Sequence, residues 1–187
     1  MLSWSGSLSV ILVNFRKRRE KFDLLCDRAS PPGILFPRNE SCESYARYLE
    51  KPDQQIDHLI QEGYTHFLTG LAEGADVDFA RCVLLKKEKF PHIAITLEAS
   101  LPYPYSPIKR MGTAAAERAI ILAMCDQVTE VSPYYRNGCM RKRNLYMVDK
   151  SNLIPAIWNG IEKGGTWNTI QSARHKEKSI CYILLHE

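Results

Sequence analysis

The sequence contains no uninterrupted apolar segment of the roughly 18–20 residues that a membrane-spanning helix requires. Residues 1–13 are mildly apolar, but the basic cluster follows them, whereas a secretory signal has its basic residues first. We therefore expect no export and no membrane association, and predict a cytoplasmic protein. The 187 residues, 45% of them hydrophobic and 25% charged, suffice for one domain with a full core.

Metal-binding and catalytic motifs are also lacking. The six cysteines form no C-x-x-C pair and have no histidine at metal spacing, so the sequence predicts no metal site and assigns no cofactor. Cys82 and Cys125 lie in apolar helical patterns and Cys181 in an apolar strand pattern, which indicates small core residues in a reducing compartment. There is no P-loop, nucleophile elbow or H-E-x-x-H motif, so no catalytic residue is assigned.

A strong charge of one sign is absent from most of the chain. The net charge is +4, and residues 1–32 carry +3 of it through six basic and three acidic side chains. The remainder is nearly neutral, which disfavours nucleic acid as a partner.

What the chain does contain is a regular alternation of helical and strand patterns from residue 41 onward. Helices are expected at 41–63, 75–88, 113–125, 139–150 and 166–175, and strands at 65–69, 93–97, 127–131, 153–158 and 180–185. Pro52 either kinks or restarts the first helix. Short connections between alternating strands and helices predict an α/β fold, Rossmann-like, with a mainly parallel sheet and helices on both faces in a single domain.

Two glycine-rich loops follow expected strands, where open α/β sheets bind ligands. In the first, Gly70 and Gly74 allow a close backbone approach, and Asp76 either caps the next helix or bonds a ribose hydroxyl. In the second, at 160–166, glycines leave room for a phosphate and a threonine hydroxyl donates to it or caps the helix. The predicted residues of this second loop are Gly160, Gly164, Gly165 and Thr166. Tight turns with ordinary caps would give the same pattern.

A third candidate lies on the helix expected at 139–150. Arg143, Asn144 and Asp149 fall within two helical turns, and an arginine can hold a phosphate through two hydrogen bonds. A solvated basic helix face is the alternative interpretation.

These loops also carry a family resemblance. The segments 61–80, 126–132, 138–151 and 156–170 resemble the YpsA-like family of the SLOG superfamily, which includes the DNA-processing protein DprA (Smf) and the LOG nucleotide hydrolases. The resemblance covers about residues 35–187 and implies a Rossmann-like domain over 33–187 with a pocket for a nucleotide-derived ligand. For the YpsA-like branch it also implies a role linked to bacterial cell division or stress. The ligand loops that it implies are Gly70, Gly74 and Asp76, then Arg143 and Asn144, then Gly164, Gly165 and Thr166.

The front of the chain departs from that family. Its members begin with a strand that runs into Thr-Gly-His-Arg-Pro, a first ligand loop, whereas residues 26–32 here read Cys-Asp-Arg-Ala-Ser-Pro-Pro. One choice of codons for these residues, read one base later, encodes Ala-Thr-Gly-His-Arg-Pro. We hypothesise that residues 1 to about 32 are translated out of frame. Codons in the gene that are incompatible with the shifted motif would exclude this hypothesis.

Three functions remain open. The first is a regulatory protein that binds a nucleotide or a nucleotide-derived small molecule, with a protein partner and homo-oligomers left open. The second is a LOG-like hydrolase, but those enzymes resemble one another in a glutamate three residues after the glycine-threonine pair, where this chain has Thr169. The third is a DprA-like binder of single-stranded DNA, for which a basic aromatic patch is the candidate. That patch consists of Tyr134, Tyr135, Arg136, Arg141, Lys142 and Arg143.

Overall fold

The computed structural model describes residues 12–14, 43–72, 74–104, 113–158, 160 and 162–184. The segment 26–32, on which the frameshift hypothesis rests, lies outside these residues. The strands are β1 (Leu12–Asn14), β2 (His66–Thr69), β3 (Thr96–Leu101), β4 (Gln127–Glu130), β5 (Leu153–Trp158) and β6 (Ser179–Leu184). The helices are α1 (Glu43–Gln61), α2 (Ala75–Lys89), α3 (Thr113–Met124), α4 (Cys139–Lys150) and α5 (Gly164–His175).

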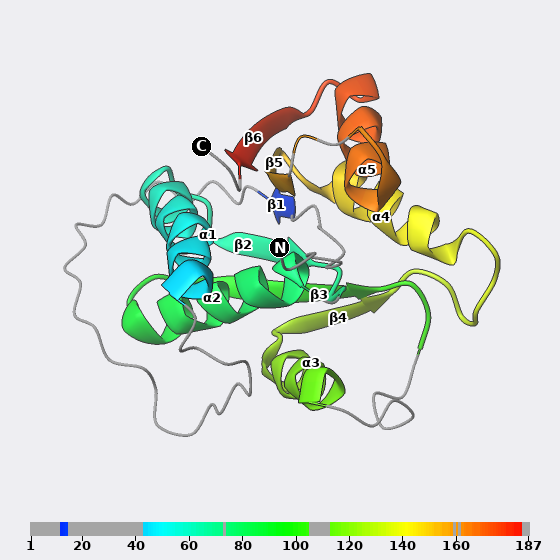
Figure 1. Cartoon of the computed structure of the whole chain (residues 1–187). Coiled ribbons are helices and arrows are strands. Elements are labelled where there is room, and N and C mark those ends of the chain that lie inside the picture. The colour runs from blue at the N-terminus through cyan, green and yellow to red at the C-terminus, as the bar shows by residue number, and fades with distance from the viewer. Residues whose placement is uncertain are drawn as a thin grey trace.

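The six strands form one sheet in the order β4-β3-β2-β1-β5-β6. The pairs β2–β3, β3–β4 and β5–β6 are parallel, so the predicted α/β fold with a mainly parallel sheet is confirmed. The α1–α2 and α2–α3 pairs pack together, and α4 packs against α5 in a separate group across the sheet (Figure 1). From β2 the chain continues toward β4, and from β5 toward β6, so the order reverses between β2 and β5.

The strand at this reversal point runs against its neighbours. β1 is antiparallel to β2, with Leu12 opposite Leu68 and Asn14 opposite His66, and it is antiparallel to β5 through Val13 and Leu153. The direction of this strand was not predicted from the sequence. Because β1 points the other way, the described loops that flank this point at the carboxyl edge are those after β2 and β5.

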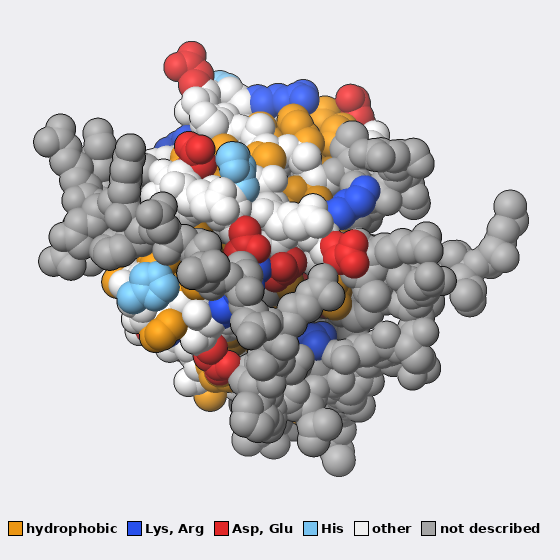
Figure 2. Space-filling model, turned by 90° about the vertical axis from the view of Figure 1, so that its left-hand side faces the viewer, with side chains coloured by type: hydrophobic (Ala, Val, Ile, Leu, Met, Phe, Trp, Pro, Cys, Tyr) orange, Lys and Arg blue, Asp and Glu red, His pale blue; other side chains and the backbone are white. Residues whose placement is uncertain are grey.

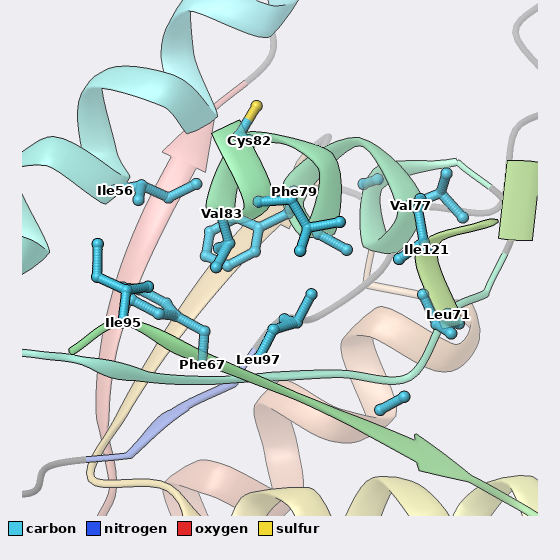
Figure 3. Packing of buried hydrophobic residues seen from close by; sticks show 14 of the residues in the cluster. Ile56, Phe67, Leu71, Val77, Phe79, Cys82, Val83, Ile95, Leu97 and Ile121 are labelled. Atoms are coloured by element: carbon cyan, nitrogen blue, oxygen red, sulfur yellow. The ribbon is translucent and has the colours of Figure 1, made fainter. Parts of the chain in front are cut away.

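The larger hydrophobic core lies between the sheet and α1–α3. Phe67 and Phe79 are completely buried and their ring centroids lie 6.1 Å apart, at the centre of the packing in Figure 3. Ile56 brings α1 into this cluster and Ile121 brings α3. Cys82 is also part of it, and burial raises the pKa of its thiol to about 12. The prediction of a core residue is confirmed for Cys82, whereas Cys125 and Cys181 are only partly buried.

Two strands differ from the sequence-based prediction. β3 ends at Leu101, four residues beyond the predicted end, because the polar Glu98 and Ser100 that suggested a loop occupy buried positions within the strand. β6, expected as an apolar strand at 180–185, is an edge strand, and Tyr182 is 38% exposed although Ile183 is buried. Its apolar composition reflects the face that packs on the core, not burial on both sides.

The helices agree better with prediction. α1 continues through Pro52 without a restart. Among the described residues, no helix has both the length and the apolar composition needed to cross a bilayer. Seen from the left-hand side of Figure 1, acidic, basic and hydrophobic side chains are interspersed over the described surface (Figure 2).

Candidate functional site

The loop after β2 is fixed by hydrogen bonds to the first turn of α2. The Thr69 hydroxyl accepts a bond from the Leu71 amide and donates to the Asp76 carbonyl, at 3.1 Å each. The Asp76 carboxylate accepts a bond from the Ala72 amide at 3.0 Å, so this side chain binds the preceding loop and does not cap its own helix. These bonds connect residues 69–72 to the first turn of α2.

Gly70 makes room in this loop for an arginine. A Cβ atom placed there would lie 2.0 Å from Nη1 of Arg143 and 2.9 Å from Oδ2 of Asp76. A side chain at this position would have to displace the end of the Arg143 side chain, so glycine is favoured here by close approach and not by backbone conformation. The Arg143 guanidinium and the Asp76 carboxylate therefore lie close together beside Gly70. In the sequence, only the family resemblance grouped these two residues.

Arg143 is a buried cation, with 7% of its surface exposed. Its Nη1 donates to the Gly70 carbonyl, and its Nε donates to Oδ1 of Asn144 at 2.8 Å. Burial lowers the pKa of the guanidinium below its ordinary value, while the Asp76 carboxylate acts in the opposite direction. Both hydrogen-bond acceptors are neutral, so the carboxylate of Asp76 is the described anion that offsets this positive charge.

A chain of hydrogen bonds continues from Arg143 to α5. Nδ2 of Asn144 donates to the Thr169 hydroxyl at 3.0 Å, and this hydroxyl donates to the Gly165 carbonyl at 2.9 Å. Thr169 was not predicted as a site residue. Its spacing of four residues from Gly165 is the signal that could have identified it, because residues four apart lie on one face of a helix.

The N-termini of α2, α4 and α5 lie at this carboxyl edge, because each of these helices follows a parallel strand. The N-cap residues of α2, α4 and α5 are Gly74, Gly138 and Lys163, and none makes a side-chain capping bond. α5 begins at Gly164, whose φ of +85° favours glycine. The predicted cap by Thr166 is wrong, because the helix starts two residues earlier and Thr166 lies buried inside its first turn.

Two predicted residues are not brought into this arrangement. Asp149 lies at the other end of α4, about 9 Å further along the axis than Arg143, and is paired there with Lys176. Gly160 is exposed in the loop after β5, and an added Cβ there would meet nothing within 4 Å.

A pair of stacked tryptophans brackets the second glycine loop. Trp158 ends β5 and Trp167 lies in the first turn of α5, with ring centroids 5.4 Å apart and planes inclined by 15°. Arg174 lies over the Trp167 ring, 5.3 Å from its centroid. The two stacked indoles connect the end of β5 to the start of α5. Their fluorescence should therefore respond to a change in the loop between them.

A second polar cluster, which sequence reasoning missed, lies under α4. His66 Nε2 is 3.3 Å from one Glu98 oxygen, and the Tyr146 hydroxyl donates to the other at 3.0 Å. His66 Nδ1 lies 2.8 Å from the Thr96 hydroxyl. Burial alone raises the pKa of Glu98, but hydrogen bonds from His66, Thr129 and Tyr146 outweigh it, so the pKa lies below its ordinary value. Within the described part of the chain, no group of three His, Cys, Asp or Glu residues is arranged to hold a metal ion.

Comparison with known proteins gives a relative. No family model matches the chain. The uncharacterised SPbeta prophage-derived protein YoqJ of Bacillus subtilis (strain 168) is 31% identical over 134 aligned residues, which cover 64% of this chain and 75% of YoqJ. The chain belongs to the YoqJ family. YoqJ is uncharacterised, so this relationship assigns no activity to the chain.

Proposed function

We propose that this chain is a regulatory protein that binds a nucleotide or a nucleotide-derived ligand at the carboxyl edge of the sheet, in the cytoplasm. The observation that carries the proposal is the buried Arg143, which touches the loop after β2 and connects through Asn144 and Thr169 to the start of α5. Three helices, α2, α4 and α5, begin at the same edge of the sheet without a side-chain cap, and such termini favour anions.

The polar parts of such a ligand match these groups. Phosphate oxygens suit the amides at the start of α5 and the positive charge of Arg143, while the Asp76 carboxylate suits a ribose hydroxyl. The resemblance to the YpsA-like family supports the same ligand class and suggests a link to bacterial cell division or stress.

The two alternatives fit the geometry less well. A LOG-like hydrolase needs a carboxylate at the position of Thr169, and Thr169 is 3% exposed and bonded to Asn144 and Gly165. A DprA-like DNA-binding patch included Arg143, but this side chain is buried and bonded to Gly70, so it is withdrawn from the basic surface.

A thermal-shift titration tests the proposal, with AMP, NAD, ADP-ribose and cyclic AMP as ligands. A ligand that binds only the folded protein raises the melting temperature with concentration, and at a hundredfold excess over Kd it adds about 2.7 kcal/mol of stability. Emission from Trp158 and Trp167, which bracket the glycine loop, gives a second readout. No shift with any nucleotide, on a protein that folds, would contradict the proposal.

Matched variants at Gly165 separate the charge of the site from its shape. Gly165→Asp should abolish binding because it places a negative charge beside the phosphate position, whereas the uncharged Gly165→Asn should retain much of it. Both variants should fold, because nothing lies within 4 Å of an added Cβ and an acidic residue in the first turn of a helix is favourable. An equal loss of ligand binding in both variants would show that the site does not prefer anions.

A repaired protein tests the contribution of the front segment. In it, residues 26–32 are replaced by Ala-Thr-Gly-His-Arg-Pro, and the same ligands are titrated. A thermal shift in both proteins would mean that the loops at 70–76 and 160–166 suffice. A shift in the repaired protein alone would mean that this chain is a damaged copy of a binding protein.

A further inference from the structure

We infer that the loop between β4 and α4, with the first turn of α4, is a docking surface for an acidic segment of a partner protein. Figure 1 shows this loop extending away from the sheet, beyond the end of β4. Its exposed surface, here called the tyrosine surface, consists of Tyr134, Tyr135, Arg136, Met140, Arg141 and Lys142. The inference is independent of the proposed nucleotide site.

The first argument is the exposure of large apolar side chains. Tyr135 is 67% exposed, Tyr134 52% and Met140 49%, which makes this the densest group of exposed large hydrophobic residues among those described. Single exposed apolar residues are ordinary, but three gathered on one short segment indicate an interaction site.

The second argument is that backbone hydrogen bonds hold both ends of this loop. The Val131 amide donates a hydrogen bond to the Leu101 carbonyl at 2.9 Å, and the Cys139 amide donates one to the Arg136 carbonyl at 3.1 Å. The side chain of Cys139 is buried and anchors the start of α4. A preorganised surface loses little conformational entropy when a partner binds.

The third argument is the sign of the charge. Between Glu130 and Asp149 the sequence contains no acidic residue, while Arg136, Arg141 and Lys142 are all exposed. This contrasts with the mixed surface in Figure 2, where acidic and basic side chains alternate. A partner that covers these cations must supply carboxylates.

The chemistry of the rings favours a protein over a nucleic acid. Arg136 lies over the Tyr134 ring, 4.4 Å from its centroid, so its own cation occupies a face on which a base would stack. Tyr135 meets Tyr103 edge to face at 5.5 Å, and the exposed Met140 offers a flexible apolar side chain. Tyrosine, methionine and arginine are the residues enriched at the centre of protein interfaces.

The test is a selection from a library of random 12-residue displayed peptides, followed by fluorescence anisotropy with the enriched peptides. We expect enriched peptides with Asp or Glu on both sides of an apolar residue, and a loss of affinity of at least about tenfold in Tyr135→Ser and Arg141→Glu. Ile120→Ser, on α3, is the matched control because Ile120 is also exposed, at 40%, and its variant should bind like the unchanged protein.

Four outcomes would overturn the inference. The first is a selection without enrichment, or peptides without acidic residues. The second is equal affinity for the two surface variants and the unchanged protein. Binding of a twelve-residue thymidine oligonucleotide that only these variants abolish would assign the surface to nucleic acid. Self-association in sedimentation that the variants abolish would assign it to a second copy of this chain. Unchanged melting temperatures of the variants, both on exposed positions, exclude unfolding as the cause.

Discussion

The two faces of the sheet are built on different principles. The face under α1–α3 holds a large, continuous cluster of apolar residues, several of them completely buried. The face under α4 and α5 holds a smaller apolar cluster around Met147 and Ile170, accompanied by buried polar groups such as Arg143, Thr169 and Glu98.

This difference predicts that the face under α1–α3 contributes mainly to stability and the face under α4 and α5 mainly to specific binding. Apolar burial is non-directional, so the first face depends mainly on side chains that fill its volume, although Lys86 of α2 also forms ion pairs there with Asp53 and Asp57 of α1. The second face depends on hydrogen bonds whose donors and acceptors must coincide, and a lost partner there leaves a buried polar group unpaired. Substitutions on the first face should therefore change stability most, and those on the second should change ligand binding more than stability.

The largest effect on stability is expected from Phe79→Ala. The ring is completely buried against Phe67, so its removal leaves a cavity and should lower the free energy of unfolding by about 3–5 kcal/mol. Urea unfolding monitored by circular dichroism measures the change. Ile120→Ala, at an exposed site on α3, should change it by less than about 0.5 kcal/mol. Similar losses in both variants would contradict the picture of a core centred on Phe79.

Gly70→Ala should lower the free energy of unfolding less than Phe79→Ala does, but it should reduce ligand binding more. The added methyl group would collide with the Arg143 guanidinium and force it away, which should cost about 1–3 kcal/mol of stability and abolish any nucleotide-induced thermal shift. Gly165→Ala is the matched control, because its methyl group meets nothing and alanine favours the helix by about 0.5–1 kcal/mol. If the two variants changed stability in the same direction, the close approach at Gly70 would be wrong.

The sequence predicted most of the fold because local patterns mark its elements. α4 and β5 agree with prediction to the residue, since Gly138 precedes the helix and a continuous apolar run forms the strand. The end of β3 was missed because buried polar residues such as Glu98 interrupt the apolar pattern, and a pattern cannot distinguish a bonded carboxylate from a solvated one. The direction of β1 depends on pairing with strands more than 50 residues away, which local sequence does not encode.

The site was predicted in parts. Gly70, Arg143 and Gly165 follow from loop position and from the family resemblance, but their connection through Thr169 depends on the packing of α4 on α5. Asp149 was grouped with Arg143 because both lie on one predicted helix, although six residues along a helix axis separate them by about 9 Å.

Thr169→Val should have a moderate effect. It removes the acceptor for Asn144 and the donor to Gly165 while keeping the side-chain shape, so stability should fall by about 1 kcal/mol. Binding of the nucleotide should weaken as well, because Asn144 no longer fixes Arg143. Thr169→Ser keeps the hydroxyl and should restore both properties. Equal behaviour of the serine and valine variants in unfolding and in titration would rule out the hydroxyl as the connecting group.

The smallest effect is confined to acidic pH and concerns Glu98. Its pKa is lowered in the folded protein, so its carboxylate contributes stability that is fully present above the ordinary value of 4.5 and is lost as pH falls through the folded pKa. Glu98→Gln removes this titration, so the urea midpoint of the variant should fall less steeply than that of the unchanged protein between pH 5 and pH 3. At pH 7 the variant should be the less stable of the two, because His66 and Tyr146 then face a neutral amide.

Glu62→Gln provides the control for this pH dependence, because Glu62 is exposed and its removal should leave the steepness of the acid limb unchanged. Parallel acid limbs for Glu98→Gln and the unchanged protein would mean that the hydrogen bonds from His66 and Tyr146 do not hold the carboxylate ionised. The polar cluster would then add no charge-dependent stability, and the contrast between the two faces would rest on the Arg143 network alone. A shallower limb for Glu98→Gln only would instead show that the polar cluster under α4 contributes to stability through the charge of Glu98.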